Sequence, residues 1–349
     1  MPKKKSNALV SFVYLKELAH WVDSLLLTSS PVMIEYPTTI SNTSNGSWYE
    51  RHGFNLGVMA IIWVFLALIA FNVMAGLVGV IAALFLVDDP TNVDAIMQVL
   101  SEQTTVFFWI NTAGQITVFA LGSLLVTRLA AEPGARRHFL RLQINSDTHK
   151  YILWAIVLTA AAYPMVIFLG WLNAFLPVPG WMAEMQQSMD EMIAKLLGSE
   201  NILWMGLFHI GLIPSICEEI MYRGYVQRSL EKSWGIWTAI IVSGLIFGAY
   251  HLQITRILPL AALGMLFAYI TYVSNSLIPA MVAHLVNNGG QIILSTIYPE
   301  ILDQELNADT DLPWVLILPG VVILISLISI FHKRYLANIP SQLANTLNN

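Results

Sequence analysis

Two adjacent carboxylates lie in an apolar stretch of this chain. Glu218 and Glu219 fall within residues 202–222, which are otherwise largely apolar, and Arg223 follows at once. A charged side chain near the centre of a membrane helix costs about 2.5–3.5 kcal/mol on insertion scales, and such residues usually mark a working site. The stretch therefore predicts a functional site inside a membrane helix.

Two further polar motifs occur in apolar surroundings. His251 ends the run Phe247-Gly248-Ala249-Tyr250-His251, and His284 opens the run His284-Leu285-Val286-Asn287-Asn288. A carboxylate, two imidazoles and an amide can together accept a proton and donate hydrogen bonds. This combination favours an enzyme that activates water.

The spacing of the motifs predicts that they meet. Glu218 lies 16 residues before Trp234 and His251 lies 17 after it, so in an antiparallel helical hairpin rising about 1.5 Å per residue they reach nearly equal depth. A second loop is expected near residues 274–276, and His284 and Asn288 lie about two to three helical turns beyond it. We expect one site, recessed from the cytoplasmic face.

Helical phase separates the two glutamates. Glu219 and Arg223 are four residues apart, which suits an ion pair within one helix. Glu218 points about 100° away and is left without a built-in countercharge, as a general base requires. His209, nine residues before Glu218, faces the opposite side and is expected to be a packing residue.

The same four-residue spacing recurs in the other two motifs. His284 and Asn288 are predicted to share one helix face. Phe247 and His251 are predicted to share another, with the phenyl ring walling the imidazole.

Composition indicates that these motifs sit in an integral membrane protein. Of 349 residues, 56% are hydrophobic and 11% are charged, against about 25% charged in soluble domains. We predict an all-α, polytopic transmembrane bundle of about eight spans, each long enough for a bilayer. The predicted spans are residues 55–86, 105–130, 151–175, 203–227, 235–256, 257–274, 276–297 and 313–331.

Two flanking segments, residues 12–26 and 181–197, have the apolar stripes of amphipathic helices that lie in the membrane interface. The second is expected to be a surface anchor rather than a lid over the site. We divide the chain into an N-terminal amphipathic helix and linker (1–53), a two-span region (54–149), a catalytic core (150–298), and a last span with its tail (299–349).

The basic residues are distributed asymmetrically between the loops of this arrangement. The cytoplasmic side receives fifteen Lys and Arg residues, and the opposite side receives only Lys195 and Arg256. By the positive-inside rule both termini lie in the cytoplasm. The expected location is the inner or plasma membrane, and the expected partners are membrane lipids and a membrane-associated protein or peptide, not nucleic acid.

The single cysteine, Cys217, excludes an intramolecular disulfide and a cysteine-rich metal site. Although it neighbours Glu218, we interpret it as a small buried hydrophobic residue.

Taken in order, Glu218-Glu219-X-X-X-Arg223, Phe247-X-X-X-His251 and His284-X-X-X-Asn288 resemble the motif set of the CPBP (Abi) intramembrane endopeptidases, which include the CAAX-prenyl endopeptidases. The resemblance covers about residues 150–298. It implies peptide-bond hydrolysis in or at the membrane. Glu218 would activate water with the help of His251, His284 and Asn288 would stabilise the oxyanion, and Glu219 and Arg223 would hold the architecture.

The role of a metal is left open by the sequence. Glu218, His251 and His284 would make a three-ligand zinc site with a fourth position for water. The same groups can also work without an ion, with glutamate as the base, and we favour that interpretation slightly.

Two other classes of function compete with a protease. A non-catalytic membrane partner, such as an immunity factor using the same fold for binding, would tolerate Glu218→Gln. An ion-coupled transporter would also bury Glu and His, but transporters often contain duplicated halves, and no internal repeat is evident here.

Overall fold

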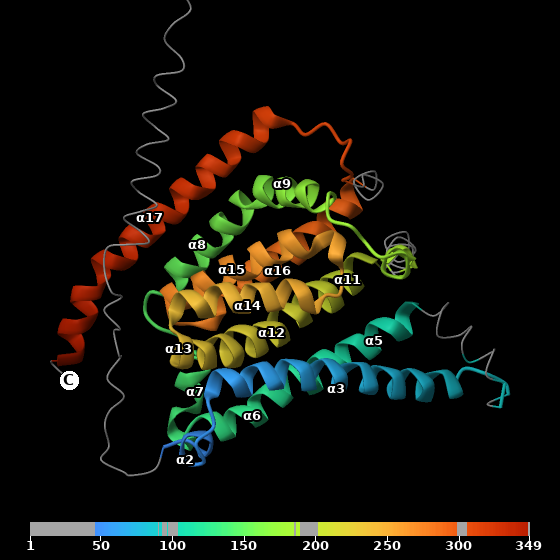
Figure 1. The fold of residues 1–349 in the computed structure, drawn as a ribbon, viewed down its shortest axis with the longest axis horizontal. Coiled ribbons are helices and arrows are strands. Elements are labelled where there is room, and N and C mark those ends of the chain that lie inside the picture. Colours follow the sequence, from blue (N-terminus) through green and yellow to red (C-terminus); the bar gives the residue numbers. More distant parts are fainter. Residues whose placement is uncertain are drawn as a thin grey trace, which may run out of the picture. The chain divides into compact units, whose positions relative to one another are not determined.

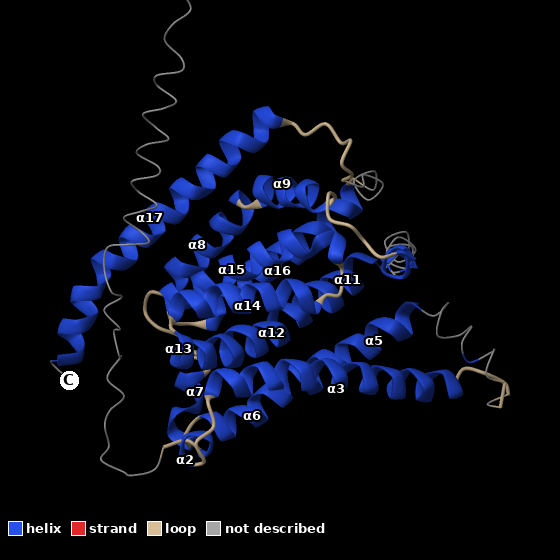
Figure 2. Cartoon of the chain, in the orientation of Figure 1, coloured by secondary structure: helices blue, strands red, loops and turns tan. Residues whose placement is uncertain are grey.

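The computed structural model describes residues 46–89, 91–92, 96, 104–184, 186–188, 202–298 and 306–347. Within these ranges every regular element is a helix (Figures 1 and 2), which confirms the all-α prediction. Contacts divide the chain into Met1–Ser44 with Ala344–Asn349, and Asn45–Leu343; the fold below is that of the second unit. The predicted amphipathic segment 12–26, and most of 181–197, lie outside the described residues.

The helices of the amino-terminal half are α2 (Trp48–Arg51), α3 (Leu56–Leu84), α5 (Thr104–Gly114), η1 (Gln115–Gly122), α6 (Ser123–Ala130), η2 (Pro133–Ala135), α7 (Arg136–Phe139), α8 (Thr148–Ala161) and α9 (Tyr163–Asn173). Those of the carboxy-terminal half are α11 (Ile202–Gly206), η3 (Leu207–Leu212), α12 (Ile213–Glu219), η4 (Ile220–Gln227), α13 (Arg228–Trp234), α14 (Ile236–Tyr250), η5 (Ile254–Arg256), α15 (Ile257–Ser274), α16 (Leu277–Ile297) and α17 (Trp314–Leu347).

The helices of the structure lie where the sequence predicted spans, but in the part of the chain that it describes fewer than the predicted eight are long enough to cross a membrane. Among the described residues, six helices are long and apolar enough to cross a membrane, and a seventh span results if α8 and α9, which meet at 43°, count as one. The break is explained by Pro164, because proline has no N–H for the carbonyl of residue 160. α14 is a shorter apolar helix, since it ends at Tyr250 rather than continuing to residue 256.

Three stretches of these long helices are π-helical. η1 interrupts the helix of residues 104–130, and η3 and η4 lie on either side of α12, the short segment that ends in Glu218 and Glu219. A π-helical turn has a wider hydrogen-bond ladder and often occurs at functional sites. Both carboxylates of the first motif thus sit at the boundary of such a turn.

The α14–α15 hairpin positions the second motif by close backbone approach. A Cβ on Gly248 would lie 2.8 Å from the Ala261 nitrogen and the Ile257 carbonyl oxygen, and one on Gly264 would lie 3.0 Å from the Cα of Gly244. Small residues four apart allow membrane helices to pack this tightly. The glycines therefore set how near Phe247 comes to the neighbouring helices.

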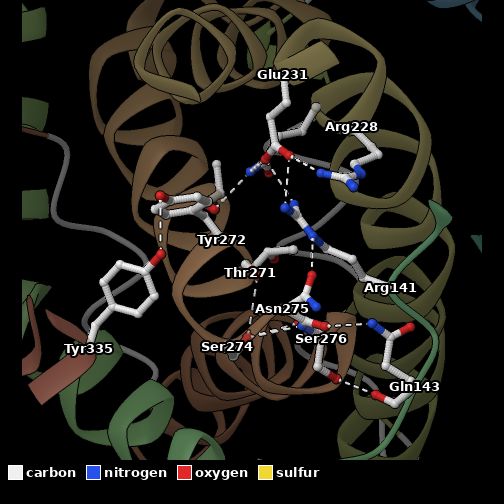
Figure 3. Close-up of polar contacts among 12 residues, drawn as sticks. Arg141, Gln143, Arg228, Glu231, Thr271, Tyr272, Ser274, Asn275, Ser276 and Tyr335 are labelled. Atoms are coloured by element: carbon white, nitrogen blue, oxygen red, sulfur yellow. Dashed lines mark hydrogen bonds and ion pairs between the residues drawn. The ribbon is translucent and has the colours of Figure 1, made fainter. Parts of the chain in front are cut away.

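A polar cluster fixes the loop between α7 and α8 to the ends of three helices (Figure 3). Arg141 donates two hydrogen bonds of 2.8 Å to the carboxylate of Glu231 and one of 3.0 Å to the side-chain oxygen of Asn275. Asn275 forms the turn between α15 and α16 in a left-handed conformation (φ 46°). The backbone N–H of Leu277 donates to the Arg141 carbonyl, so this loop anchors the start of α16.

That anchor explains how α16 reaches the level of the carboxylates. Leu277, its first residue, packs against Gly224, ten residues before the end of α13 at Trp234. His284 lies seven residues into α16, and Glu219 lies five residues before Gly224. At 1.5 Å per residue these two side chains come to similar depths. α12 itself packs against η1 on one side and against α16 on the other.

Candidate functional site

Glu219 is the centre of a buried hydrogen-bond network. Its Oε1 accepts from the Arg223 guanidinium and from Nδ1 of His284, both at 2.9 Å. Glu219 and Arg223 are fully buried, and His284 is 3% exposed. The predicted ion pair within the helix is confirmed, and the same carboxylate connects the first motif to the third.

Arg223 is held by more than its countercharge. A second guanidinium nitrogen donates to the Gly264 carbonyl at 3.1 Å, and the guanidinium lies 4.4 Å from the centroid of the Phe247 ring. A buried cation needs such hydrogen bonds and a polarisable face to offset its desolvation. Arg223 thus ties the first motif to α14 and α15.

The Phe247 ring lies between the other motif residues. Its centroid is 5.0 Å from that of the His251 ring and 5.7 Å from that of the His284 ring. The predicted contact between Phe247 and His251 is confirmed. Because His284 and Arg223 contact the other parts of the same ring, residues from all three motifs meet around it.

His284 and Asn288 lie on one face of α16, as predicted. The Asn288 amide nitrogen is 3.2 Å from Nε2 of His284 and 2.9 Å from the carbonyl oxygen of Ile210. That carbonyl is available because Pro214, four residues later, has no N–H to donate to it. Since Nδ1 of His284 donates to Glu219, Nε2 is the acceptor, and both N–H bonds of Asn288 are engaged.

Glu218 faces a different neighbour from Glu219. Its Oε1 accepts from the side-chain amide of Gln115 at 2.9 Å, and its Oε2 has no hydrogen-bond partner among the described residues. Glu218 is 8% exposed and Gln115 is 6% exposed. The hydrogen bond to Glu218 thus comes from a neutral amide, whereas Glu219 pairs with a guanidinium.

Gln115 is the site residue that the motifs did not reveal. It begins η1, more than eighty residues before the region in which the motifs lie. The signal in the sequence was weak: a single glutamine in a predicted apolar span. Such residues commonly form hydrogen bonds between membrane helices.

His251 lies at the carboxyl end of α14, where it is exposed. Its Nδ1 is 2.8 Å from the carbonyl oxygen of Phe247, so Nδ1 carries the proton and Nε2 is left as an acceptor. This hydrogen bond fixes the ring beside Phe247. The second motif therefore presents an imidazole in a fixed orientation.

His209 lies apart from this network. It is 2% exposed, its Nδ1 is 2.6 Å from the Thr112 hydroxyl, and its ring stacks on Phe108 at 5.3 Å. Both partners belong to α5. These contacts agree with the expectation of a packing histidine.

The residues do not fit the three-ligand zinc site. Among the described residues no three His, Cys, Asp or Glu side chains gather closely enough to hold a metal ion. Both nitrogens of His284 are already in hydrogen bonds, to Glu219 and Asn288, so neither is free as a ligand in this arrangement. A cavity of about 660 Å³ lies elsewhere, between α8 and α17, and none of the motif residues lines it.

Comparison with known proteins supports the interpretation of the motifs. Residues 200–290 match the family model described as type II CAAX prenyl endopeptidase Rce1-like, and these residues contain all three motifs. No curated protein and no solved structure matches the chain. The chain is a multi-pass membrane protein in which residues 200–290 are similar to the type II CAAX prenyl endopeptidases.

Proposed function

We propose that this protein hydrolyses a peptide bond in a membrane-associated protein, with Glu218 as the general base. The observation that supports this most directly is the contrast between two adjacent carboxylates. Glu219 is neutralised by Arg223 and bound to His284. Glu218 is bound instead to the neutral amide of Gln115. Each carboxylate has a second oxygen without a hydrogen-bond partner among the described residues, so the contrast lies in the countercharge, and a carboxylate that is not held in an ion pair takes up a proton more easily.

In the proposed reaction, Oε2 of Glu218 accepts a proton from a water molecule while the water oxygen attacks the carbonyl carbon of the scissile bond. The carbonyl oxygen becomes an oxyanion in the tetrahedral intermediate. When the C–N bond breaks, the proton held by Glu218 passes to the leaving nitrogen. The products are a new carboxylate and a new amine, and Glu218 is regenerated.

The other motif residues have distinct parts in this proposal. His251, with Nε2 free to accept, assists Glu218 in binding the water. Asn288 donates to the oxyanion, and for this it exchanges its hydrogen bond to Ile210 for one to the substrate, while His284 orients the Asn288 amide through Nε2. Hydrogen bonds of this kind often tighten only when substrate is bound.

Glu219 and Arg223 act on the reaction through His284 in this scheme. Their ion pair holds the imidazole by Nδ1, which fixes both the tautomer and the orientation of the ring. Because the described part of the chain does not gather three metal-binding side chains in this arrangement, no step is assigned to a metal.

The substrate class follows from the membrane location and the family. A site formed between apolar helices suits a peptide held near the bilayer by a lipid anchor or by its own membrane helix. A prenylated carboxy-terminal peptide is the first candidate, because the matching family is that of the CAAX prenyl endopeptidases.

A cleavage assay tests the proposal. Purified protein in lipid nanodiscs is incubated with an internally quenched peptide that ends in a farnesylated CAAX sequence, and with the same peptide lacking the farnesyl group. We expect cleavage of the first at a rate well above that of the second. Failure to cleave either peptide, or any membrane-helix peptide in a panel, would count against an endopeptidase.

A further inference from the structure

Four buried polar atoms near Glu218 have no hydrogen-bond partner among the described residues. They are Oε2 of Glu218, Oε1 of Gln115, and the hydroxyls of Tyr222 and Tyr250. In native proteins such groups are nearly always satisfied by protein, water or ligand. Leaving one unsatisfied costs about 1–3 kcal/mol, so four together indicate a place where something polar binds.

These atoms come from one region of the bundle. Gln115 donates to Glu218, and Tyr222 lies one helical turn beyond Glu218. The rings of Tyr222 and Tyr250 are 5.7 Å apart and nearly perpendicular. The carboxylate of Glu218 interacts electrostatically with both phenols.

The Gln115 helix closes the group from the other side. Phe119, one turn beyond Gln115, contacts the Tyr250 ring at 5.5 Å. η1, the α12–η4 boundary and the end of α14 therefore meet near Glu218. Other buried polar atoms also lack a hydrogen-bond partner among the described residues. The hydroxyl of Tyr225 is one, beside Tyr49 and Ser229, and Oε2 of Glu219 is another, although the other oxygen of Glu219 is bound to Arg223 and His284.

The donors of the third motif are committed elsewhere. The Nδ1 proton of His284 is bound by Glu219, and both N–H bonds of Asn288 are engaged. The two tyrosine hydroxyls are buried donors without a partner among the described residues. A phenol and a neutral amide can each both donate and accept a hydrogen bond.

We propose that Gln115, Tyr222 and Tyr250 complete the site around Glu218; this inference rests on the proposed function. The Gln115 amide fixes the carboxylate through Oε1. Its own oxygen and Oε2 of Glu218 accept the two hydrogens of the attacking water, which leaves a lone pair free for attack; Gln115 thus takes the place beside Glu218 that the proposed function gave to His251. The hydroxyls of Tyr222 and Tyr250 donate to the carbonyl oxygen of the substrate peptide.

Part of the active site thus lies outside residues 200–290, on a helix that the family model does not cover. The helix of residues 104–130 is a working part of the enzyme in this scheme, because it supplies an acceptor to the water. Substrate can bind without Gln115, but the water would be less well oriented.

Substitutions that remove single polar atoms test this. Gln115→Met keeps the length of the side chain and removes the amide, while Tyr222→Phe and Tyr250→Phe remove one hydroxyl each. Loss of one well-placed donor to a developing charge can cost about 100-fold in kcat. We expect kcat on the farnesylated peptide to fall roughly 10- to 100-fold for each variant, with KM within about threefold of wild type, as for an interaction made chiefly in the transition state.

Two variants serve as matched controls. Thr112→Val removes another buried hydrogen bond from the same long helix, to His209. Tyr225→Phe removes a buried hydroxyl from the same helix as Tyr222. Both should keep kcat near that of wild type, whatever they do to thermal stability. Equal losses of kcat in the controls and the test variants, or wild-type kcat in the test variants, would overturn the proposal.

An infrared measurement separates this proposal from the proposed function. The carboxylate band of Glu218 is identified by its loss in Glu218→Gln. It should shift in Gln115→Met and not in Thr112→Val, even if the wild-type protein cleaves no peptide. An unshifted band would overturn the role of Gln115 independently of activity. If Gln115→Met fails to accumulate, Gln115→Asn, whose amide is one methylene too short to reach Glu218, replaces it with the same expectations.

Discussion

At the scale of single residues, two neighbouring glutamates have different surroundings because consecutive side chains on a helix point about 100° apart. Glu219 faces α16 and is bound to Arg223 and His284. Glu218 faces η1 and is bound to the neutral Gln115. The first is suited to hold the site together and the second to take up a proton.

This division of roles predicts different effects of substitution. Glu219→Ala and Arg223→Ala each leave a fully buried charge without its partner, which costs about 3–5 kcal/mol. We expect both to lower the yield and thermal stability of folded protein. Glu218→Ala, which removes no ion pair, should retain most of that stability and lose turnover. Thermal denaturation in detergent checks this, and similar melting temperatures for the three variants would contradict it.

The sequence predicted the contacts within each motif better than those between motifs. Spacing of four residues correctly indicated the Glu219–Arg223 pair and the shared faces of α14 and α16. It did not predict the hydrogen bond from His284 to Glu219. Residue spacing gives the depth of a side chain along its own helix, but it does not give the rotation of that helix relative to a helix of another hairpin. Gln115 was missed for the same reason, since it contacts Glu218 from a distant helix.

At the scale of elements, the site depends on how closely α14 and α15 pack and on how the start of α16 is held. The close packing of α14 on α15 depends on glycines, and the position of the start of α16 depends on the Arg141–Glu231 cluster. The π-helical segments η1, η3 and η4 could not be predicted, because a single wide turn leaves no periodic signal in the sequence. The bend at Ala162 had a visible cause in Pro164, although residues 151–175 were predicted as one span.

The glycine contacts predict a steric effect. Gly248→Ala places a methyl group 2.8 Å from backbone atoms of Ala261 and Ile257, and backbone cannot move aside as a flexible side chain can. We expect a separation of α14 from α15, with loss of stability and of cleavage because Phe247 and His251 move with the helix. Gly76→Ala is the control, since a methyl group there meets nothing within 4 Å. Comparable stability of the two variants, measured by thermal denaturation, would argue against close packing of the hairpin.

The polar cluster at the start of α16 predicts a contrast between two ion pairs. Arg141 and Glu231 are 3% and 7% exposed, whereas Lys150 and Asp147 are 66% and 47% exposed. Arg141→Ala removes hydrogen bonds to a buried charge, which are worth about 1.5–3 kcal/mol, although Glu231 keeps its ion pair with Arg228. Breaking the exposed pair with Lys150→Ala should cost at most about 1 kcal/mol. Equal melting temperatures for the two variants would show that the cluster in Figure 3 does not anchor the loop.

At the scale of the whole molecule, composition alone predicted the class correctly. Few residues are buried in the most apolar windows of α3 and of residues 314–335 of α17, as in helices that face lipid. The predicted number of spans depended on treating each apolar segment as one straight helix of full length. This fails for α8 and α9, which meet at a bend, and for α14, which is shorter than a span. The charge asymmetry also included Arg141 and Arg223, which are buried and paired, so they add less to the positive-inside signal than exposed loop residues do.

The orientation in the membrane is a further prediction. The remaining basic residues still favour one side, so topology reporters should place both termini and the 131–150 loop in the cytoplasm. The same reporters should place the 88–103 and 298–312 loops outside. Cysteine accessibility at engineered positions in these loops checks the assignment, and an external carboxy terminus would contradict it.

The most direct test of the central claim is the turnover of Glu218→Gln compared with that of wild type, on the farnesylated peptide and at matched amounts of folded protein. The substitution keeps the shape of the side chain and the neighbours of Glu218, but removes the group that takes a proton from water. General-base catalysis contributes about 10²–10⁴-fold to rate, so we predict that kcat falls at least about 100-fold while melting temperature stays close to that of wild type. Wild-type turnover by a folded Glu218→Gln protein would contradict the proposal that Glu218 activates the water.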